Sequence, residues 1–230
     1  MPVIDVQDVT HRFDDRPGAP SVLANVTVTL TEQRVGVVGA NGSGKSTFAR
    51  LINGLVVPSQ GEVTVDGRST ARHGREIRRR VGFCFTDPDA QIIMPTVRED
   101  VAYSLKGSGL SAEEDAARVD ATLDRFRLAA LADHPSHLLS GGEKQLLALA
   151  AVLIRDPDVV VMDEPTTLLD LRNTRMFGDV IAGLPHQVIL VTHHLDLLAD
   201  FDRVLVFDAG RLVCDDRPDA ALRHYVDLSR

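Results

Sequence analysis

A run of small residues near the start of the chain constrains its fold more than any other feature. Residues 39–47 read Gly-Ala-Asn-Gly-Ser-Gly-Lys-Ser-Thr and fit the pattern G-x-x-x-x-G-K-[ST]. Glycines leave backbone N–H groups open to an anion, because no Cβ obstructs the turn. Lys45 would add a point charge for the β- and γ-phosphates, and the Ser46 hydroxyl would ligate Mg²⁺. The run predicts a nucleoside triphosphate site formed by Gly39, Asn41, Gly42, Ser43, Gly44, Lys45, Ser46 and Thr47.

The flanking segments support this interpretation. Residues 34–38 are apolar enough for a short buried strand, and residues 48–52 suit the helix that would follow. A helix in that place directs the partial positive charge of its N-terminus at the phosphates. A Gly/Ser-rich loop that matched by chance would lack this strand, loop and helix order.

Composition limits the other possibilities. The 230 residues are 44% apolar, which suits one large α/β domain, and their formal charge of −8 argues against a nucleic-acid partner. Cys84 and Cys214 lie in strand-like runs, so we expect buried free thiols in a reducing compartment. Because no apolar stretch of about 18 residues and no signal-peptide pattern occurs, we expect a cytoplasmic protein that does not cross the membrane.

Hydrophobic patterning changes twice along the chain. Alternation over residues 22–30 predicts a half-buried antiparallel strand with Val22, Ala24, Val26, Val28 and Leu30 on one face. Residues 62–67 and 81–85 read as two further strands. From about 96 to 155 the spacing is helical, with Ala116, Val119, Leu123 and Phe126 on one face.

Strands return after this helical part. Unalternating apolar runs at 159–162, 188–191 and 204–207 suit parallel strands that are covered on both faces. We therefore predict an α/β fold: a phosphate-loop core with a mostly parallel sheet, an N-terminal antiparallel β subdomain and an inserted helical lobe. All 230 residues would form one domain, with the core at about 1–95 and 156–230 and the lobe at about 96–155.

Two carboxylates follow the first of these later strands. Asp163 and Glu164 come directly after the apolar run 159–162. A parallel strand would deliver them to the carboxyl edge of the sheet, where the phosphate loop would also lie. There Asp163 could hold Mg²⁺ and Glu164 could act as a general base on the attacking water. An acidic pair exposed at a strand end is the alternative.

A second glycine-containing helix start lies in the helical part. In Leu-Ser-Gly-Gly-Glu-Lys-Gln (139–145), Ser140 and Glu143 have the spacing of a capping box. Capping alone does not explain Gly141 and Gly142, because two glycines in the first turn weaken a helix. They do leave backbone N–H groups open to an anion, so this helix start could also bind phosphate.

Together these runs resemble the ATP-binding-cassette ATPases over essentially the whole chain. Residues 39–47, 140–143, 163–164 and 192–193 follow the order and rough spacing of that family, and run 140–143 is the most specific of them. The resemblance implies an ATPase that uses ATP and Mg²⁺. It also implies a head-to-tail dimer, in which each ATP lies between one subunit's phosphate loop and the other's signature helix.

The resemblance assigns roles to individual residues. It implies that Ser140 and Gly142, beside Gly141, contact the γ-phosphate across the dimer and that Asp170 is the D-loop aspartate. His193 would be the catalytic switch histidine, with a structural role as the alternative. Phe13 matches the aromatic residue that stacks on adenine, where tyrosine is more usual, and a place in the core is the alternative.

Residues 87–103 resemble a narrower group, the ATPases of energy-coupling-factor transporters. In these an extra segment around a glutamine, here Gln91, precedes Thr-Val-x-x-Asp-Val-Ala. The resemblance implies a peripheral protein on the cytoplasmic face of the cell membrane, with a transmembrane coupling subunit and a substrate-binding membrane subunit as partners. The chain ends soon after its last predicted strand, which favours a dedicated importer with two copies of one ATPase. We expect biotin as cargo; a cobalt/nickel importer, another family transporter and a soluble ATPase in cofactor assembly are the alternatives.

One residue departs from the family pattern. Thr86 stands where the family usually has a glutamine that reaches Mg²⁺ and the attacking water. A threonine hydroxyl can ligate Mg²⁺ but reaches less far. Either Gln91 compensates for the change or coupling is tuned differently.

The apolar cluster Ile-Ile-Met-Pro at 92–95 has two interpretations. It could pack inside the helical lobe. It could instead line a groove for a coupling helix, because exposed apolar patches mark binding sites.

Overall fold

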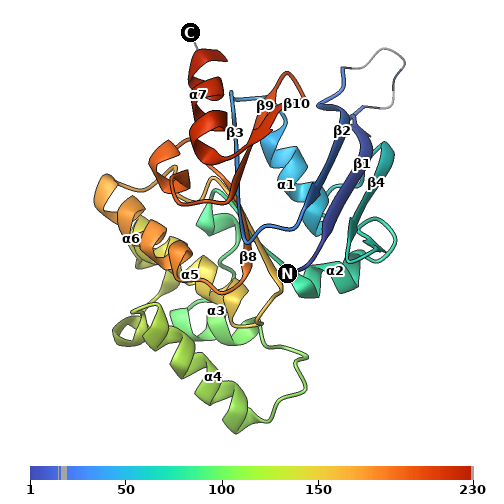
Figure 1. Ribbon diagram of the computed structural model, residues 1–230. Coiled ribbons are helices and arrows are strands. Elements are labelled where there is room, and N and C mark those ends of the chain that lie inside the picture. The colour runs from blue at the N-terminus through green and yellow to red at the C-terminus, as the bar shows by residue number, and fades with distance from the viewer. Residues whose placement is uncertain (15, 17–19, 229–230) are drawn as a thin grey trace.

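Two β-sheets of different type lie on either side of helix α1 (Lys45–Asn53), as Figure 1 shows. The computed structural model describes residues 1–14, 16 and 20–228. The smaller sheet is antiparallel and has the strand order β2-β1-β4-β5. Its strands are β1 (Ile4–His11), β2 (Leu23–Leu30), β4 (Gln60–Val65) and β5 (Arg68–Ser69).

The larger sheet is mostly parallel and has the strand order β10-β9-β3-β8-β7-β6. Its strands are β3 (Arg34–Gly39), β6 (Val81–Cys84), β7 (Val159–Asp163), β8 (Gln187–Val191), β9 (Arg203–Asp208) and β10 (Arg211–Asp216). Only the edge strand β10 runs antiparallel to its neighbour. The carboxyl ends of β3, β7 and β8 therefore meet at one edge of the sheet, where the predicted site residues follow them.

The remaining helices cover the sheets or form the lower left part of Figure 1. They are α2 (Gly74–Arg80), α3 (Val97–Tyr103), α4 (Ala112–Arg125), α5 (Gly141–Leu153), α6 (Leu171–Ala182) and α7 (Pro218–Leu228). Short 3₁₀ turns occur at η1 (Pro88–Ala90), η2 (Ala129–Leu131), η3 (Ser136–Leu138) and η4 (Leu195–Leu198). The predicted α/β class, with an antiparallel sheet and a mostly parallel one, is confirmed. We also propose that the chain is a single domain in which residues 96–155 form an inserted lobe.

The hydrophobic core forms two clusters, one on each face of the larger sheet. One cluster joins α1 to the inner face of the antiparallel sheet and includes the fully buried Phe48 and Phe207. The other lies under α5 and α6 and includes Leu147 and Phe177. Because the strands of the larger sheet are buried on both faces, apolar and polar residues do not alternate in the runs after residue 158.

The predicted face of β2 is only partly correct. Val26, Val28 and Leu30 are buried as expected, whereas Val22 and Ala24 are half-buried and Leu23 is fully buried instead. Asn25, inside this strand, has a φ of 54° and its N–H donates to Thr10 Oγ1. This bulge shifts the alternation by one residue, which places Leu23 on the core face.

The expectation that both cysteines are buried is wrong for Cys214. Cys84 is fully buried, and burial raises the pKa of its thiol to about 12. Cys214 is only half-buried, because it lies on the edge strand β10.

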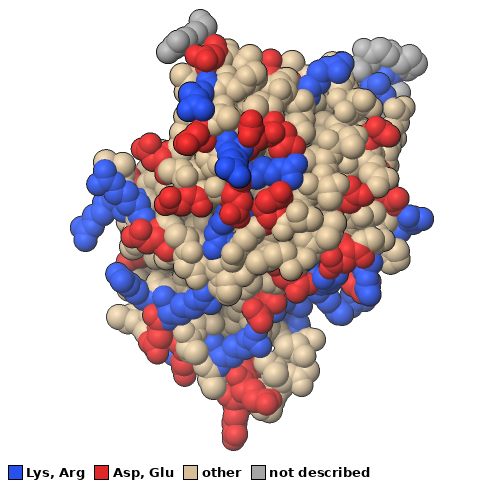
Figure 2. Space-filling model, in the orientation of Figure 1, with Lys and Arg blue, Asp and Glu red and all other residues tan. Residues whose placement is uncertain are grey.

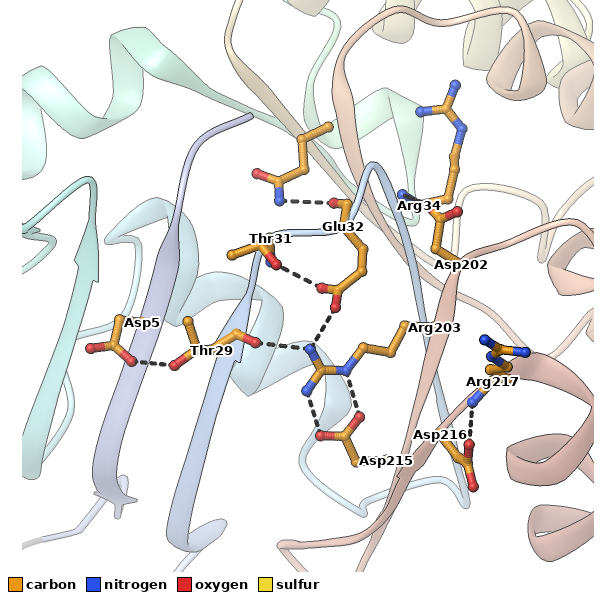
Figure 3. Close-up of polar contacts among 11 residues, drawn as sticks. Asp5, Thr29, Thr31, Glu32, Arg34, Asp202, Arg203, Asp215, Asp216 and Arg217 are labelled. Atoms are coloured by element: carbon orange, nitrogen blue, oxygen red, sulfur yellow. Dashed lines mark hydrogen bonds and ion pairs between the residues drawn. The ribbon is translucent and has the colours of Figure 1, made fainter.

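Arg203, at the start of β9, links the two sheets (Figure 3). Its guanidinium binds both carboxylate oxygens of Asp215 at 2.6 Å, and its Nη1 donates to Glu32 Oε1 and to the Thr29 carbonyl at 2.9 Å. Its side chain is 22% exposed. The hydrogen bond to Asp215 is the main cause of a raised Arg203 pKa. The arginine therefore stays charged and connects β9 and β10 to the end of β2.

Acidic and basic side chains are interspersed on the face that Figure 2 shows.

Among the described residues, no helix is both long enough and apolar enough to span a membrane.

Candidate functional site

The phosphate loop connects β3 to α1 and needs glycine at two places. Gly39 has a φ of 151°, and a Cβ there would lie 2.1 Å from the Phe207 carbonyl oxygen. Gly44 has a φ of 97° and is the N-cap of α1, where a Cβ would lie 2.7 Å from the Val22 carbonyl oxygen. Neither conformation suits a residue with a side chain. The loop can therefore approach both Phe207 and Val22 closely while its N–H groups stay available.

Lys45 is held inside this loop. Its Nζ donates to the carbonyl oxygens of Gly39 at 2.7 Å and Ala40 at 2.9 Å, and the residue is only 5% exposed. Burial lowers the pKa of Lys45, while the nearby charges of Glu164 and Asp163 oppose that shift. The Lys45 ammonium is thus held beside the predicted phosphate site.

A cavity of about 430 Å³ lies over the loop. Most residues of the predicted nucleotide site line it, together with residues from five other segments. Those other residues are Phe13, Val22, Thr86, Glu164, Thr167 and His193. The structure thus brings together side chains that lie up to about 180 residues apart in the sequence.

Asp163 ends β7 directly beside the start of α1. Its Oδ1 accepts from the Ser46 hydroxyl at 2.7 Å, and its Oδ2 lies 3.3 Å from Arg50 Nη2. The carboxylate is almost fully buried. A hydroxyl and a carboxylate beside a phosphate site fit Mg²⁺, which prefers oxygen ligands and is often bound by one or two carboxylates plus substrate phosphates. Ser46 and Asp163 therefore fit the predicted metal site.

Glu164 has an unusual backbone and two side-chain contacts. Its φ is 54°, a conformation that non-glycine residues rarely adopt. Its Oε2 accepts from the Thr167 hydroxyl at 3.2 Å, and its Oε1 lies 3.0 Å from His193 Nε2. The same His193 nitrogen lies 3.0 Å from Asn41 Oδ1 of the phosphate loop. Glu164 and His193 are thus in contact with each other at the wall of the cavity, and their catalytic roles stay a prediction.

Phe13 lies at the rim of the cavity and is 70% exposed. Its ring packs edge-on against His11 at a centroid distance of 4.8 Å. The alternative that Phe13 belongs to the core is therefore wrong. An exposed ring beside a nucleotide-sized cavity is available for stacking.

The side chains of Thr86 and Gln91 both bond to backbone groups. The Thr86 hydroxyl lines the cavity but donates to the Asp163 carbonyl at 2.7 Å. The Gln91 side chain accepts from Phe85 N at 3.2 Å and donates to the Ala148 carbonyl at 2.9 Å. Gln91 thus joins β6 to α5, and the idea that it compensates for Thr86 finds no support in these contacts.

The residues of the predicted signature helix do not line the cavity, and neither does Asp170. Ser140 forms the capping box of α5, accepting from Glu143 N at 3.4 Å while Glu143 Oε2 accepts from Ser140 N at 2.8 Å. Gly141 is exposed, and a Cβ on the buried Gly142 would lie 2.9 Å from the Asn173 side chain. Asp170 caps α6 by accepting from Asn173 N at 2.7 Å.

Two residues of the site were not anticipated from the sequence. Thr167 contacts Glu164, and Arg50 contacts Asp163. Thr167 lies three residues after Glu164, the spacing of a tight turn, which could have indicated the contact. Arg50 lies one helical turn after Ser46, so that the two share a face of α1.

Comparison with known proteins gives a consistent result. The model of the family described as "ABC transporter" matches residues 23–167. An ABC transporter ATP-binding protein of Deinococcus radiodurans is 52% identical over 97% of both chains. The biotin transport ATP-binding protein BioM of Rhizobium etli is 48% identical over 92% of this chain and 94% of that protein. The cobalt import ATP-binding protein CbiO of Syntrophus aciditrophicus is 38% identical over 96% of this chain and 80% of that protein.

Among solved structures, CbiO1 of Clostridium perfringens superposes with a TM-score of 0.84 at 29% sequence identity. The match covers 98% of this chain and 93% of that one. This CbiO1 is described as part of the ABC transporter complex CbiONQ.

Proposed function

This chain is a member of the ABC transporter ATPase family, and we propose that it is the ATP-hydrolysing subunit of an energy-coupling-factor importer for biotin. Lys45, Glu164 and His193 line one cavity, and Asp163 accepts a hydrogen bond from Ser46 in the cavity wall; this convergence is the observation that carries the proposal. When ATP binds, the Lys45 ammonium would leave the carbonyl oxygens of Gly39 and Ala40 and donate to the β- and γ-phosphates instead.

The carboxylates and the histidine have separate tasks in this proposal. Ser46 and Asp163 would hold Mg²⁺, which when bound neutralises charge on the β- and γ-phosphate oxygens. Glu164 would accept a proton from the attacking water, because its carboxylate lies at the cavity wall. His193, 3.0 Å from both Glu164 and Asn41, would orient the water and the γ-phosphate.

The site would be completed by a second copy of the chain. Ser140, Gly141 and Gly142 lie outside the cavity, although they begin a helix whose N-terminus can bind an anion. A head-to-tail dimer would place this helix start and Asp170 of one subunit against the ATP of the other. The roles of these residues, and of Phe13 as the adenine-stacking side chain, belong to this proposal.

Glu164→Gln tests the assignment of the base and the dimer together. The variant should bind ATP, and its hydrolysis should be slower on the order of 10²-fold, the scale for losing a general base. An ATP-bound dimer should then accumulate in gel filtration. Brisk turnover by a monomeric Glu164→Gln protein would contradict both assignments.

The groove for the membrane partner would lie between α3 and the larger sheet. It has a volume of about 270 Å³ and is lined by Phe83, Phe85, Ile93 and Tyr103 among others. Ile93 is 63% exposed and Tyr103 44% exposed, an arrangement that suits an apolar helix face. The cluster at 92–95 is thus divided, because Ile92 packs against the core and Met94 does not line the groove.

Ile93→Asp should therefore break co-purification with the membrane subunits and stop uptake. The basal ATPase activity and melting temperature of the isolated protein should hold, because Ile93 is mostly exposed. Met94→Asp is the matched control, since this neighbour lies outside the groove. If Met94→Asp abolishes assembly and Ile93→Asp does not, the partner docks elsewhere.

The cargo is proposed from the relatives alone. The BioM protein is 48% identical and the CbiO protein 38% identical, which favours biotin over cobalt. We place the protein on the cytoplasmic face of the membrane, where such partners present their coupling helices. Uptake of labelled biotin and of cobalt, measured in cells with and without this chain, distinguishes the two cargoes.

A further inference from the structure

We propose that Thr167 is a positioning residue that orients the Glu164 carboxylate for ATP hydrolysis; this inference rests on the proposed function. The Thr167 hydroxyl donates to Glu164 Oε2 at 3.2 Å, and the Thr167 N–H donates to the Glu164 carbonyl at 3.3 Å. Thr167 also lines the nucleotide cavity. One residue therefore closes a turn on the backbone of Glu164 and binds its side chain.

The other contact of the carboxylate is shared. His193 Nε2 lies 3.0 Å from Glu164 Oε1 and 3.0 Å from Asn41 Oδ1, and a single N–H cannot donate fully to both. The Thr167 hydroxyl, in contrast, has no other hydrogen bond within residues 1–14, 16 and 20–228. Thr167 is thus the donor that Glu164 does not share with the phosphate loop.

The neighbouring polar side chains cannot replace this donor. The Thr86 hydroxyl is bonded to the Asp163 carbonyl, and both ends of the Gln91 amide are bonded to backbone groups. A general base must lie within hydrogen-bond reach of the proton it removes, and a small misplacement reduces the rate strongly. Holding Oε2 leaves Oε1 directed towards His193, where we place the attacking water.

The position of Thr167 also connects the base to the segment that leads into α6. The turn continues with Leu169 N donating to the Thr166 carbonyl at 3.1 Å, and Asp170 then caps α6. A displacement of residues 167–170 would carry the hydroxyl away from Oε2. Glu164 would therefore be held in place only while this turn is closed.

Thr167→Val and Thr167→Ser test the proposal, because valine keeps the shape of threonine and serine keeps the hydroxyl. We expect Thr167→Val to lower kcat about tenfold, the scale of one hydrogen bond to a charged group. The melting temperature should stay at its wild-type value, since Thr167 is exposed. The affinity for a fluorescent ATP analogue should also stay, because valine keeps the shape of the cavity wall that Thr167 contributes. Thr167→Ser should keep kcat within about threefold of wild type by the same reasoning.

A double variant separates positioning from a structural role. In the Glu164→Gln background, single-turnover hydrolysis should change no more than about twofold when Thr167→Val is added, because coupled residues are not additive. A full additional tenfold loss, unchanged kcat in Thr167→Val alone, or equal losses in the valine and serine variants would each overturn the proposal. The rate of Glu164→Gln alone tests the proposed function, so the two failures can be told apart.

Discussion

Replacing Arg203 by methionine should destabilise the protein, because it removes the charge that joins the two sheets while keeping most of the alkyl stem. The guanidinium makes four hydrogen bonds, two of them to Asp215, one to Glu32 and one to the Thr29 carbonyl. Its side chain is 22% exposed, and those of Asp215 and Glu32 are 30% and 28% exposed. The network is therefore neither fully buried nor at the open surface (Figure 3).

The magnitude follows from these exposures. Breaking a fully buried ion pair costs about 3–5 kcal/mol, and breaking an exposed pair costs about 0–1 kcal/mol. For Arg203→Met we expect about 2 kcal/mol, because water can reach both carboxylates that lose their partner. In a protein of this size that corresponds to a melting temperature lower by about 4–8 °C.

Arg98→Met is the matched control, since Arg98 pairs with Asp120 and the two side chains are 42% and 59% exposed. Its melting temperature should fall by less than about 4 °C, the equivalent of at most about 1 kcal/mol for an exposed pair. Thermal unfolding followed by circular dichroism measures both variants. Equal shifts for Arg203→Met and Arg98→Met would refute the reasoning, because burial would then not decide the cost.

Three further predictions concern the site. Lys45→Ala should abolish ATP binding in equilibrium titrations, because the triphosphate loses its main point charge; near-wild-type affinity would exclude the phosphate-loop assignment. Thr86→Gln should fold and keep ATPase activity within a few-fold, since the Thr86 side chain is half-buried and its hydroxyl donates to a backbone carbonyl, that of Asp163; a folding collapse would show that its packing matters more. The pKa of Glu143 is lowered, chiefly by the hydrogen bond from the Ser140 hydroxyl and then by that from the Ser140 N–H. The ionised Glu143 therefore stabilises the fold above its ordinary pKa of 4.5, and this stabilisation is lost as the pH falls through the lowered pKa. Melting temperatures between about pH 3 and 6 should thus fall less steeply for Glu143→Gln than for wild type, and parallel curves would contradict the capping argument.

The sequence predicted those parts of the site that depend on local order. Gly39 and Gly44 could be anticipated because a phosphate loop needs glycine at fixed spacing, and both have a positive φ. The bulge at Asn25 could not, because one residue with a left-handed backbone shifts the alternation of β2 without a compositional signal. The cap that Asp170 forms on α6 was not predicted either, because the family resemblance implies for Asp170 only a role at the dimer interface.

Side-chain partners across the fold were the least predictable part. Whether the Thr86 hydroxyl turns towards a metal or towards the Asp163 carbonyl depends on how β6 and β7 lie beside each other, and only the three-dimensional structure gives that. The same holds for Gln91, whose amide lies between Phe85 and the Ala148 carbonyl. The residue type of Thr86 and Gln91 limits which groups their side chains can bind, and the packing of β6 against its neighbours determines which groups they do bind.

The distance of Ser140 from the nucleotide cavity has a kinetic consequence. In the proposed dimer, an isolated chain holds only half of each site, so specific activity should depend on enzyme concentration. Well below the dissociation constant of the dimer, the rate should rise with the square of the chain concentration, and well above it the order should fall to one. Dilution would then act as a reversible inhibitor, and a membrane partner that holds two copies together would remove that dependence.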